Sequence, residues 1–484
     1  MPENPSDQTP RAGAVTGVLA LAGIVAAVMQ TLVVPLIGDL PALLSTSASN
    51  ASWVITATLL SAAVATPVAG RLGDMYGKHR MLLVSTVPLI IGSVVCALSS
   101  SVVPMIVGRG LQGVGMGVVP LGISLLRDLL PPERLGSAIA VMSASMGVGG
   151  ALGLPFSAAV AEHASWRVLF WVAAGLSLLV AVLVARLVPA GRSVDSTGGR
   201  FDLPGALGLG AGLVSLLLAV SKGSDWGWGS ATTLGLAAAA LALLLLWGFW
   251  ELRTTDPLVD LRVTARPQVL ITNAASVLVG FAMYAQSLVV PQLLQLPEAT
   301  GYGLGQSMMA MGLWMAPAGL AMMVLAPLGA KLSAAKGPKV TLAVGSLVIA
   351  LGYASAQLLL GSTWGLLVAS LVCNTGVGLA YGAMPALIMG AVPPRETASA
   401  NSFNTLMRSI GSSVSAAVMG VVLAQLTTDF HGRALPSEHG FRTALLIGSA
   451  VALAAAAVAA VIPAGRPATA AKDPAPAPAE AARA

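Results

Sequence analysis

The chain is a series of long apolar segments separated by short polar ones. A helix needs about 20 mostly apolar residues to cross the hydrocarbon core of a bilayer. Fourteen segments meet this condition, over residues 14–38, 53–72, 81–98, 104–125, 137–160, 168–187, 203–220, 231–250, 268–293, 305–328, 340–360, 364–389, 397–425 and 441–462. The pattern predicts an all-α, polytopic membrane protein with 14 transmembrane helices.

Composition supports lipid as the solvent of these segments. Hydrophobic residues make up 56% of the 484 residues and charged residues 9%, against about 25% charged in a typical soluble domain. A net charge of +6 can indicate a nucleic-acid partner. Here the basic residues are spread over short loops and form no single patch, so no nucleic acid is expected.

The distribution of basic residues sets the expected orientation. With the N-terminus in the cytoplasm, 19 of the 25 Lys and Arg residues fall in cytoplasmic segments and four in outer loops. The other two, Arg109 and Arg408, fall inside spans. Cytoplasmic loops of membrane proteins are enriched in Lys and Arg. We therefore expect a multi-pass protein of the cell (plasma) membrane, a monomer, with both termini cytoplasmic.

An internal repeat divides the chain. Residues 131–138 read PPERLGSA and residues 393–400 read PPRETASA, while GRLGDMYG at 70–77 is similar to AKLSAAKG at 330–337. Repeats on the same side of the membrane indicate two parallel halves with substrate between them. The predicted domains are a cytoplasmic tail (1–13), an N-terminal six-helix bundle (14–189), an inserted linker helix pair with cytoplasmic flanks (190–265), a C-terminal six-helix bundle (266–463) and a disordered cytoplasmic tail (464–484).

The segment after the second span has an unusual spacing of glycine and charge. Residues 70–80 read GRLGDMYGKHR, where Gly70 and Gly77 permit tight turning and close helix approach. Asp74 can cap a neighbouring helix N-terminus. It can also bridge the nearby cations Arg71, Lys78 and Arg80.

Two further motifs lie inside spans. Residues 108–117 read GRGLQGVGMG in the fourth span, and residues 149–155 read GGALGLP in the fifth. Together with residues 70–80, these motifs resemble those of the major facilitator superfamily. With 14 spans, the chain is most similar to the drug:proton antiporter branch of that superfamily.

The resemblance implies roles for particular residues. Asp74 would steady one end state by contacting the start of the thirteenth span, near Thr397 and Ser399. Arg109 would be linked to proton coupling. The fifth-span motif, with Gly149, Gly153 and Pro155, would bend its helix and is typical of exporters.

Two departures from the branch concern its chemistry. Its first span carries D-x-T-x-x-N, whereas residues 29–34 here read MQTLVV, without the aspartate or the asparagine. The Gly-Pro pair of the fifth span is interrupted by Leu154. The motifs therefore support the fold fully and export only in part.

Polar residues inside spans are candidates for function because burying them in lipid is costly. Arg109 either lies beside Asp39 at the outer end of the first span or reaches the outer interface. Arg408 either binds backbone carbonyls or faces a water-filled cavity. Seven others either line a central cavity or form helix–helix hydrogen bonds: Gln30, Gln112, Asn273, Tyr284, Gln286, Asn374 and Tyr381.

The chain carries no nucleotide-binding loop, no HExxH, no GxSxG and no Cys/His cluster, so we expect no enzyme, cofactor or metal site. The leading hypothesis is secondary export, by alternating access, of small apolar or amphipathic compounds such as drugs or an endogenous metabolite. An uncoupled facilitator or importer is the alternative, and a membrane sensor would need a signalling domain. For coupling, either Asp39 beside Arg109 is the proton site, or no intramembrane acid couples transport to protons.

Overall fold

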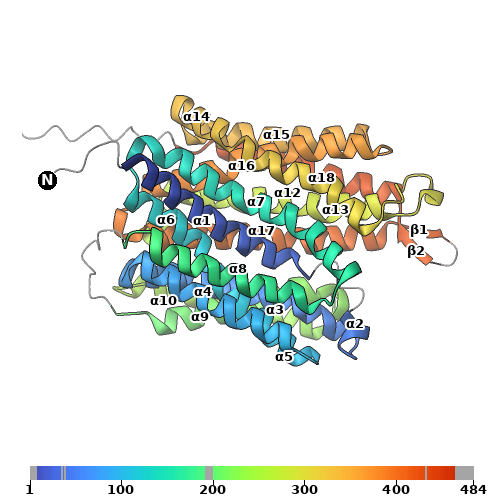
Figure 1. Ribbon diagram of the computed structural model, residues 1–484, viewed down its shortest axis with the longest axis horizontal. Helices are drawn as coiled ribbons and strands as arrows, with labels where there is room; N and C mark the ends of the chain where they lie inside the picture. The colour runs from blue at the N-terminus through green and yellow to red at the C-terminus, as the bar shows by residue number, and fades with distance from the viewer. Residues whose placement is uncertain (1–7, 34–35, 37–39, 191–199, 431–432, 464–484) are drawn as a thin grey trace, which may run out of the picture.

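A computed structural model describes residues 8–33, 36, 40–190, 200–430 and 433–463 (Figure 1). The N half consists of the helices up to Leu187: α1 (Gln8–Thr31), α2 (Leu40–Leu43), α3 (Ala48–Tyr76), α4 (Lys78–Leu98), α5 (Val102–Val114), η2 (Gly115–Gly117), α6 (Val118–Leu129), α7 (Pro132–His163) and α8 (Arg167–Leu187). An inserted hairpin follows, made of α9 (Leu203–Trp226) and α10 (Ala231–Arg253).

The C half begins after the short helix α11 (Leu261–Thr264). Its elements are α12 (Pro267–Gln295), η3 (Glu298–Thr300), α13 (Met308–Val324), α14 (Ala326–Lys336), α15 (Pro338–Leu358), α16 (Thr363–Ala391), η4 (Pro394–Glu396), α17 (Thr397–Gln425) and α18 (Glu438–Ala460). Two short antiparallel strands, β1 (Thr427–Phe430) and β2 (Arg433–Pro436), lie between α17 and α18.

Among the described residues, 14 helical stretches are long and apolar enough to cross a membrane. The predicted fold class is thereby confirmed, with the β1–β2 hairpin as an unpredicted addition at one connection. The end that carries the α3–α4 turn and the C-terminus of α14 is called the basic end below, because Arg71, Lys78, Arg80 and Lys336 lie there; it is the left end in Figure 1.

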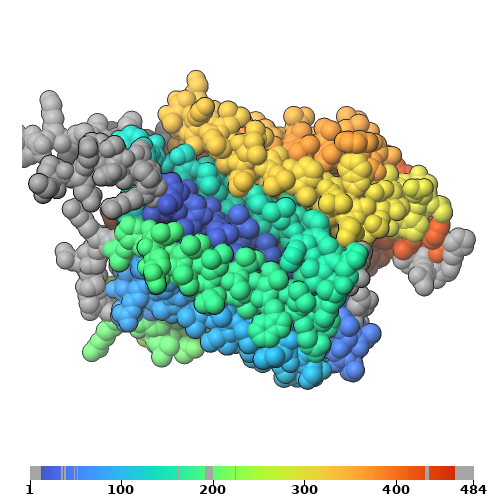
Figure 2. Space-filling view, in the orientation of Figure 1, coloured from blue at the N-terminus to red at the C-terminus, as the bar shows by residue number. Residues whose placement is uncertain are grey.

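Each half has its own apolar core. One cluster of buried side chains is built mainly from α1 to α8, with Met389 of α16 and Ala398 of α17, and a second from α12 to α18 with two alanines of α7. The halves pack against each other where α7 meets α13 and where α3 meets α17. Figure 2 shows the first of these contacts as an oblique boundary between the blue-to-green half and the yellow-to-orange half.

The inserted hairpin packs on the two halves through α9, whereas most of α10 is exposed. A third cluster joins side chains of α9 and α10 to α3, to α17 and to the segment after α10, with Leu213, Trp247, Leu258 and Phe403 among its members. The hairpin therefore packs where the two halves meet.

Several predicted boundaries differ from the structure, among them the first span, because α1 begins at Gln8, inside the predicted tail, and ends at Thr31. The segment after the second span was expected to be a loop, but α3 continues to Tyr76 because its polar last turn packs on α17 and not on lipid. The fourth span is interrupted by the 3-10 turn Gly115–Gly117. The tenth span is divided at Leu325, next to Pro327, whose ring cannot donate a helical hydrogen bond.

Candidate functional site

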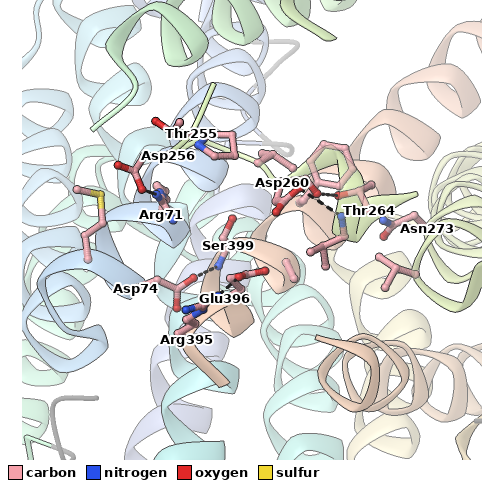
Figure 3. A pocket seen from close by; sticks show the side chains of 17 residues that line it. Arg71, Asp74, Thr255, Asp256, Asp260, Thr264, Asn273, Arg395, Glu396 and Ser399 are labelled. Atoms are coloured by element: carbon pink, nitrogen blue, oxygen red, sulfur yellow. Dashed lines mark hydrogen bonds and ion pairs between the residues drawn. The ribbon is translucent and has the colours of Figure 1, made fainter. Parts of the chain in front are cut away.

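The last turn of α3 places Asp74 against the first turn of α17 in the other half. Its carboxylate accepts the N–H of Ala398 at 3.1 Å and the N–H of Ser399 at 2.7 Å. A helix start leaves such N–H groups without intrahelical partners, and the helix dipole favours a negative charge beside them. Asp74 therefore joins the two halves at the basic end, as Figure 3 shows.

Two glycines make this contact possible. A β-carbon on Gly70 would lie 2.7 Å from the carbonyl oxygen of Ala398 and 2.6 Å from Cβ of Ser402, so only glycine lets α3 approach α17 this closely. Gly77 ends α3 with φ of 97°, a conformation that favours glycine, and turns the chain directly into α4.

Lys78 makes a second connection between the halves. Its side chain is 8% exposed, and its ammonium group lies 2.7 Å from Asp128 Oδ2 on α6 and donates to Thr397 Oγ1 at 2.9 Å. Nearby, the hydroxyl of Ser124 on α6 donates to the carbonyl of Thr397 at 3.1 Å and accepts from Asn401 Nδ2 at 3.2 Å. The start of α17 is thus held by α3, α4 and α6 together.

A polar cavity of about 300 Å³ lies beside this contact. Its walls come from the end of α3, the start of α17 and the segment that links α10 to α12. Arg71 lies 3.8 Å from Asp256 of that segment, and Glu396 and Asn273 also line the space. Arg80, by contrast, is exposed.

We call the cross-half contacts of Asp74, Lys78, Ser124 and the first turn of α17 the basic-end gate. Asp74 caps the start of α17, while the flanking cations Arg71 and Lys78 pair with other acids, Asp256 and Asp128. Asp128 and Asp256 were not among the residues singled out in the sequence. Both lie on the predicted cytoplasmic side, and their negative charge on the same side as the basic segment 70–80 could have indicated them as its partners.

Arg109 lies inside the N half. It is 1% exposed, and its guanidinium donates to the carbonyls of Met29 at 2.7 Å and Val54 at 3.3 Å and to Gln112 Oε1 at 2.6 Å. It therefore does not reach the outer interface, and it ties α5 to α1 and α3. Asp39, the expected partner, lies outside the described residues.

Arg408 occupies a different kind of site in the C half. Its guanidinium lies 4.6 Å from the ring centre of Tyr381 and donates to Thr405 Oγ1 at 3.2 Å. The Tyr381 hydroxyl in turn donates to Met283 Sδ at 2.9 Å. Arg408 is thus buried against an aromatic face, and its role in a cavity stays a prediction.

The other cavity candidates divide into three groups. Gln112 donates to Ser93 Oγ at 2.8 Å, and Asn374 donates to Gln286 Oε1 at 3.3 Å, so these residues join helices within one half. Asn273 accepts from Asn404 at 2.8 Å and also lines the polar cavity. Tyr284 is half-buried, whereas Gln30 is exposed, with its amide 3.7 Å from Met116 Sδ.

The residues expected to bend α7 lie at helix contacts. β-Carbons on Gly149 and Gly153 would overlap Ile24 and Thr31 of α1, respectively. Pro155 packs on α13, where a β-carbon on Gly312 would lie 3.0 Å from its nitrogen. These residues allow α7 to fit between the halves, and the bend itself stays a prediction.

Comparison with protein families decides the class of this membrane protein. The model of the Major Facilitator Superfamily matches residues 19–416. The chain belongs to the Major Facilitator Superfamily. With 14 apolar helices among its described residues, it is a multi-pass membrane protein of that superfamily.

Curated relatives are similar along most of this transporter. An "Uncharacterized MFS-type transporter" of Mycobacterium tuberculosis is 29% identical over 421 residues, 86% of this chain; the chain spans only 60% of that relative's length. "Multidrug resistance protein Stp" of the same organism is 26% identical over 383 residues, covering 77% of this chain and 68% of the relative. "Multidrug resistance protein 3" of Bacillus subtilis is 24% identical over 427 residues, covering 85% and 79%.

Solved structures share the fold of this transporter. The human organic anion transporter MFSD10 superposes with a TM-score of 0.64 at 14% identity, covering 94% of this chain and all of that one. The proton:xylose symporter XylE gives 0.63 at 15% identity, covering 94% and 97%. At these identities the likeness shows the arrangement of helices alone.

Proposed function

We propose that this transporter exports small apolar or amphipathic compounds by alternating access, in exchange for protons. The observation that carries the proposal is the basic-end gate. Three elements of the N half hold the first turn of α17 through hydrogen bonds, and Lys78, which makes one of them, also pairs with Asp128 of α6. Such contacts can break and re-form as a unit, which is what a carrier with two alternating openings requires.

The charge of the interior supports neutral, mostly apolar substrates. The cations within the spans include Arg109 and Arg408, and both are buried against protein groups. The sequence places no acid in the middle of a predicted span. A cationic compound would therefore meet no countercharge there, and its exit from a negative cytoplasm would cost about 2.3 kcal/mol per 100 mV.

Export as the direction of transport rests on two kinds of support. Relatives named for multidrug resistance match most of the chain. The fifth-span motif places Gly149, Gly153 and Pro155 between α1 and α13. The basic end is proposed to be the cytoplasmic side, where compounds enter the carrier before release outside.

Accumulation measurements test this function directly. The gene is expressed in a host that lacks its own pumps, and a panel of neutral, anionic and cationic compounds is scored for steady-state accumulation. We expect lower accumulation of some neutral amphipathic compounds than in cells with Asp74→Asn, expressed to the same level. Higher accumulation would instead indicate an importer, and unchanged accumulation throughout would reject drug export.

A further inference from the structure

Two carboxylates are buried together where the inserted hairpin begins and ends. Asp202 caps the start of α9 and is 6% exposed, and Glu251 lies in the last turn of α10 and is 2% exposed. Gly205 lies between them. A β-carbon at Gly205 would overlap Asp202 Oδ2 and would lie 2.9 Å from Glu251 Oε1.

The side-chain donors at this pair reach only some of its oxygens. Asp202 accepts from the N–H of Gly205 at 2.9 Å and from Trp250 Nε1 at 3.1 Å, and Glu251 Oε1 accepts from Trp247 Nε1 at 2.8 Å. Glu251 Oε2 is buried, and no side chain of the described residues donates to it.

The described cations near the pair make other contacts. The charged residues on the surrounding elements are Arg71, Arg200, Arg253, Asp256, Asp260 and Arg262, and no described cation forms an ion pair with Asp202 or Glu251. Arg71 lies beside Asp256, the Arg253 guanidinium lies 4.0 Å from the Phe249 ring centre, and Arg262 donates to the carbonyl of Leu252. Two adjacent buried carboxylates without a cation are strongly unfavourable if both are charged.

The pair is linked to the basic-end gate through the segment after α10. The backbone N–H groups of Leu258 and Val259 face the Glu251 carboxylate. On the other side of this segment, the Ser399 hydroxyl donates to the carbonyl of Leu258 at 3.2 Å. Ser399 is the residue whose N–H binds Asp74, so Leu258 connects the carboxylate pair to the gate.

We propose that Asp202 and Glu251 together bind one proton from the basic end, and that this proton keeps the basic-end gate closed. With the proton, one carboxyl group donates to the other across Gly205, and the segment at Leu258 stays on α17. Val259 lines the polar cavity, which brings water close to the pair. The inference rests on the gate of the proposed function and adds a proton site to it.

Loss of the proton opens the gate because it leaves two negative charges next to each other. Two charged carboxylates repel, and Glu251 then moves away from Asp202 and takes with it the segment whose N–H groups face it, which releases Ser399. The closed state binds one more proton than the open state. Through this pair the closed population grows as the pH falls, by at most about tenfold for each pH unit, and comparison with a variant of the pair separates this response from protonation of Asp74 in the gate.

Distance measurements on the full-length protein in liposomes test the proposal. Spin labels at Arg134→Cys in the N half and Arg395→Cys in the C half report opening of the basic end, because both native side chains are exposed there. The native Cys96 and Cys373 are buried, and protein without the added cysteines gives the background. We expect the short-distance population to grow several-fold from about pH 8 to about pH 5.

Two substitutions at the pair should act in opposite directions. Glu251→Gln places an amide N–H where the proton would be, so the gate should stay closed at every pH. Gly205→Ala puts a methyl group between the carboxylates and should favour the open gate at every pH. The control Glu438→Gln, at the opposite end of the molecule, should keep the parent's pH response.

The pH response of the distance in the parent and in the variants decides the proposal. The same pH dependence of the distance in the parent and in Glu251→Gln overturns the proposal. If the pH response is lost in Asp256→Asn but retained in Glu251→Gln, the sensor is the Arg71–Asp256 pair. This result would also overturn the proposal. Because the measurement uses neither substrate nor transport, failure of the export assay is distinguishable from failure of this proton site.

Discussion

Asp74 of α3 and Ser399 of α17 are 325 positions apart in the chain and meet through a 2.7 Å hydrogen bond between a carboxylate and a backbone N–H. The bond joins the two halves of the transporter at the basic end. Because the acceptor is charged and the donor lies at a helix start, this contact stabilises one arrangement of the halves more than an uncharged hydrogen bond would.

Replacing Asp74 by Asn should impair transport without preventing folding. The amide keeps the size of the side chain but loses its charge, which weakens the contact with Ala398 and Ser399 by about 1–2 kcal/mol. The closed gate then loses roughly tenfold in population. Transport rates at matched expression measure the effect, with Glu133→Gln, an exposed acid at the same end, as the control. Wild-type rates in Asp74→Asn would show that the charge has no part in the cycle.

Lys78 and Asp128 should behave as a coupled pair. Removing either partner leaves the other partly buried and unpaired, so Lys78→Met and Asp128→Asn should each lower stability by roughly 2 kcal/mol. The double variant should lose less than the sum of the two. Thermal unfolding of the four proteins in detergent gives the coupling energy, and strictly additive losses would contradict the ion pair as a stabilising contact.

Arg109→Lys should destabilise the N half although the charge is kept. Lysine cannot reproduce the planar fork that binds Met29, Val54 and Gln112 at once, so at least one buried acceptor loses its donor, at a cost of about 1–3 kcal/mol. Thermal unfolding should show this loss, whereas Arg134→Lys at an exposed site should unfold like the parent. Equal stability of all three proteins would mean that a single ammonium group satisfies the site.

Proton coupling through Asp39 is open to a direct measurement. In proteoliposomes with an imposed pH gradient, flux that follows the gradient and loses this response in Asp39→Asn would assign the outer proton site to Asp39. A response that survives in Asp39→Asn excludes that residue. Flux of the wild-type protein that ignores the gradient would exclude proton exchange altogether.

Orientation is tested with reporter fusions placed after Arg11 and after Lys472. The even number of spans and the concentration of basic residues at one side predict cytoplasmic signals from both. A reporter that becomes active outside the cell at either position contradicts the 14-span topology.

The sequence determined the class of this protein because lipid leaves few solutions to an apolar chain. Every backbone group inside the bilayer must be bonded within its own helix, so the lengths of the apolar segments were sufficient to predict 14 spans. The motif at residues 70–80 also indicated Asp74 as a residue that meets the thirteenth span, through a resemblance and not through distance. The same hydropathy pattern ended the second span too early, because the polar last turn of α3 packs on protein.

Only the tertiary structure decided which polar groups meet, because partners hundreds of residues apart leave no local pattern. Nothing near Lys78 in the chain points to Asp128, and nothing near Arg408 points to the ring of Tyr381. In the sequence, Asp202 precedes the first helix of the inserted hairpin and Glu251 lies near the end of the second. There, each has the pattern of an ordinary charged residue beside a membrane span. The antiparallel return of α10 along α9 brings them together and buries them, and burial is what turns two unremarked carboxylates into a candidate proton site.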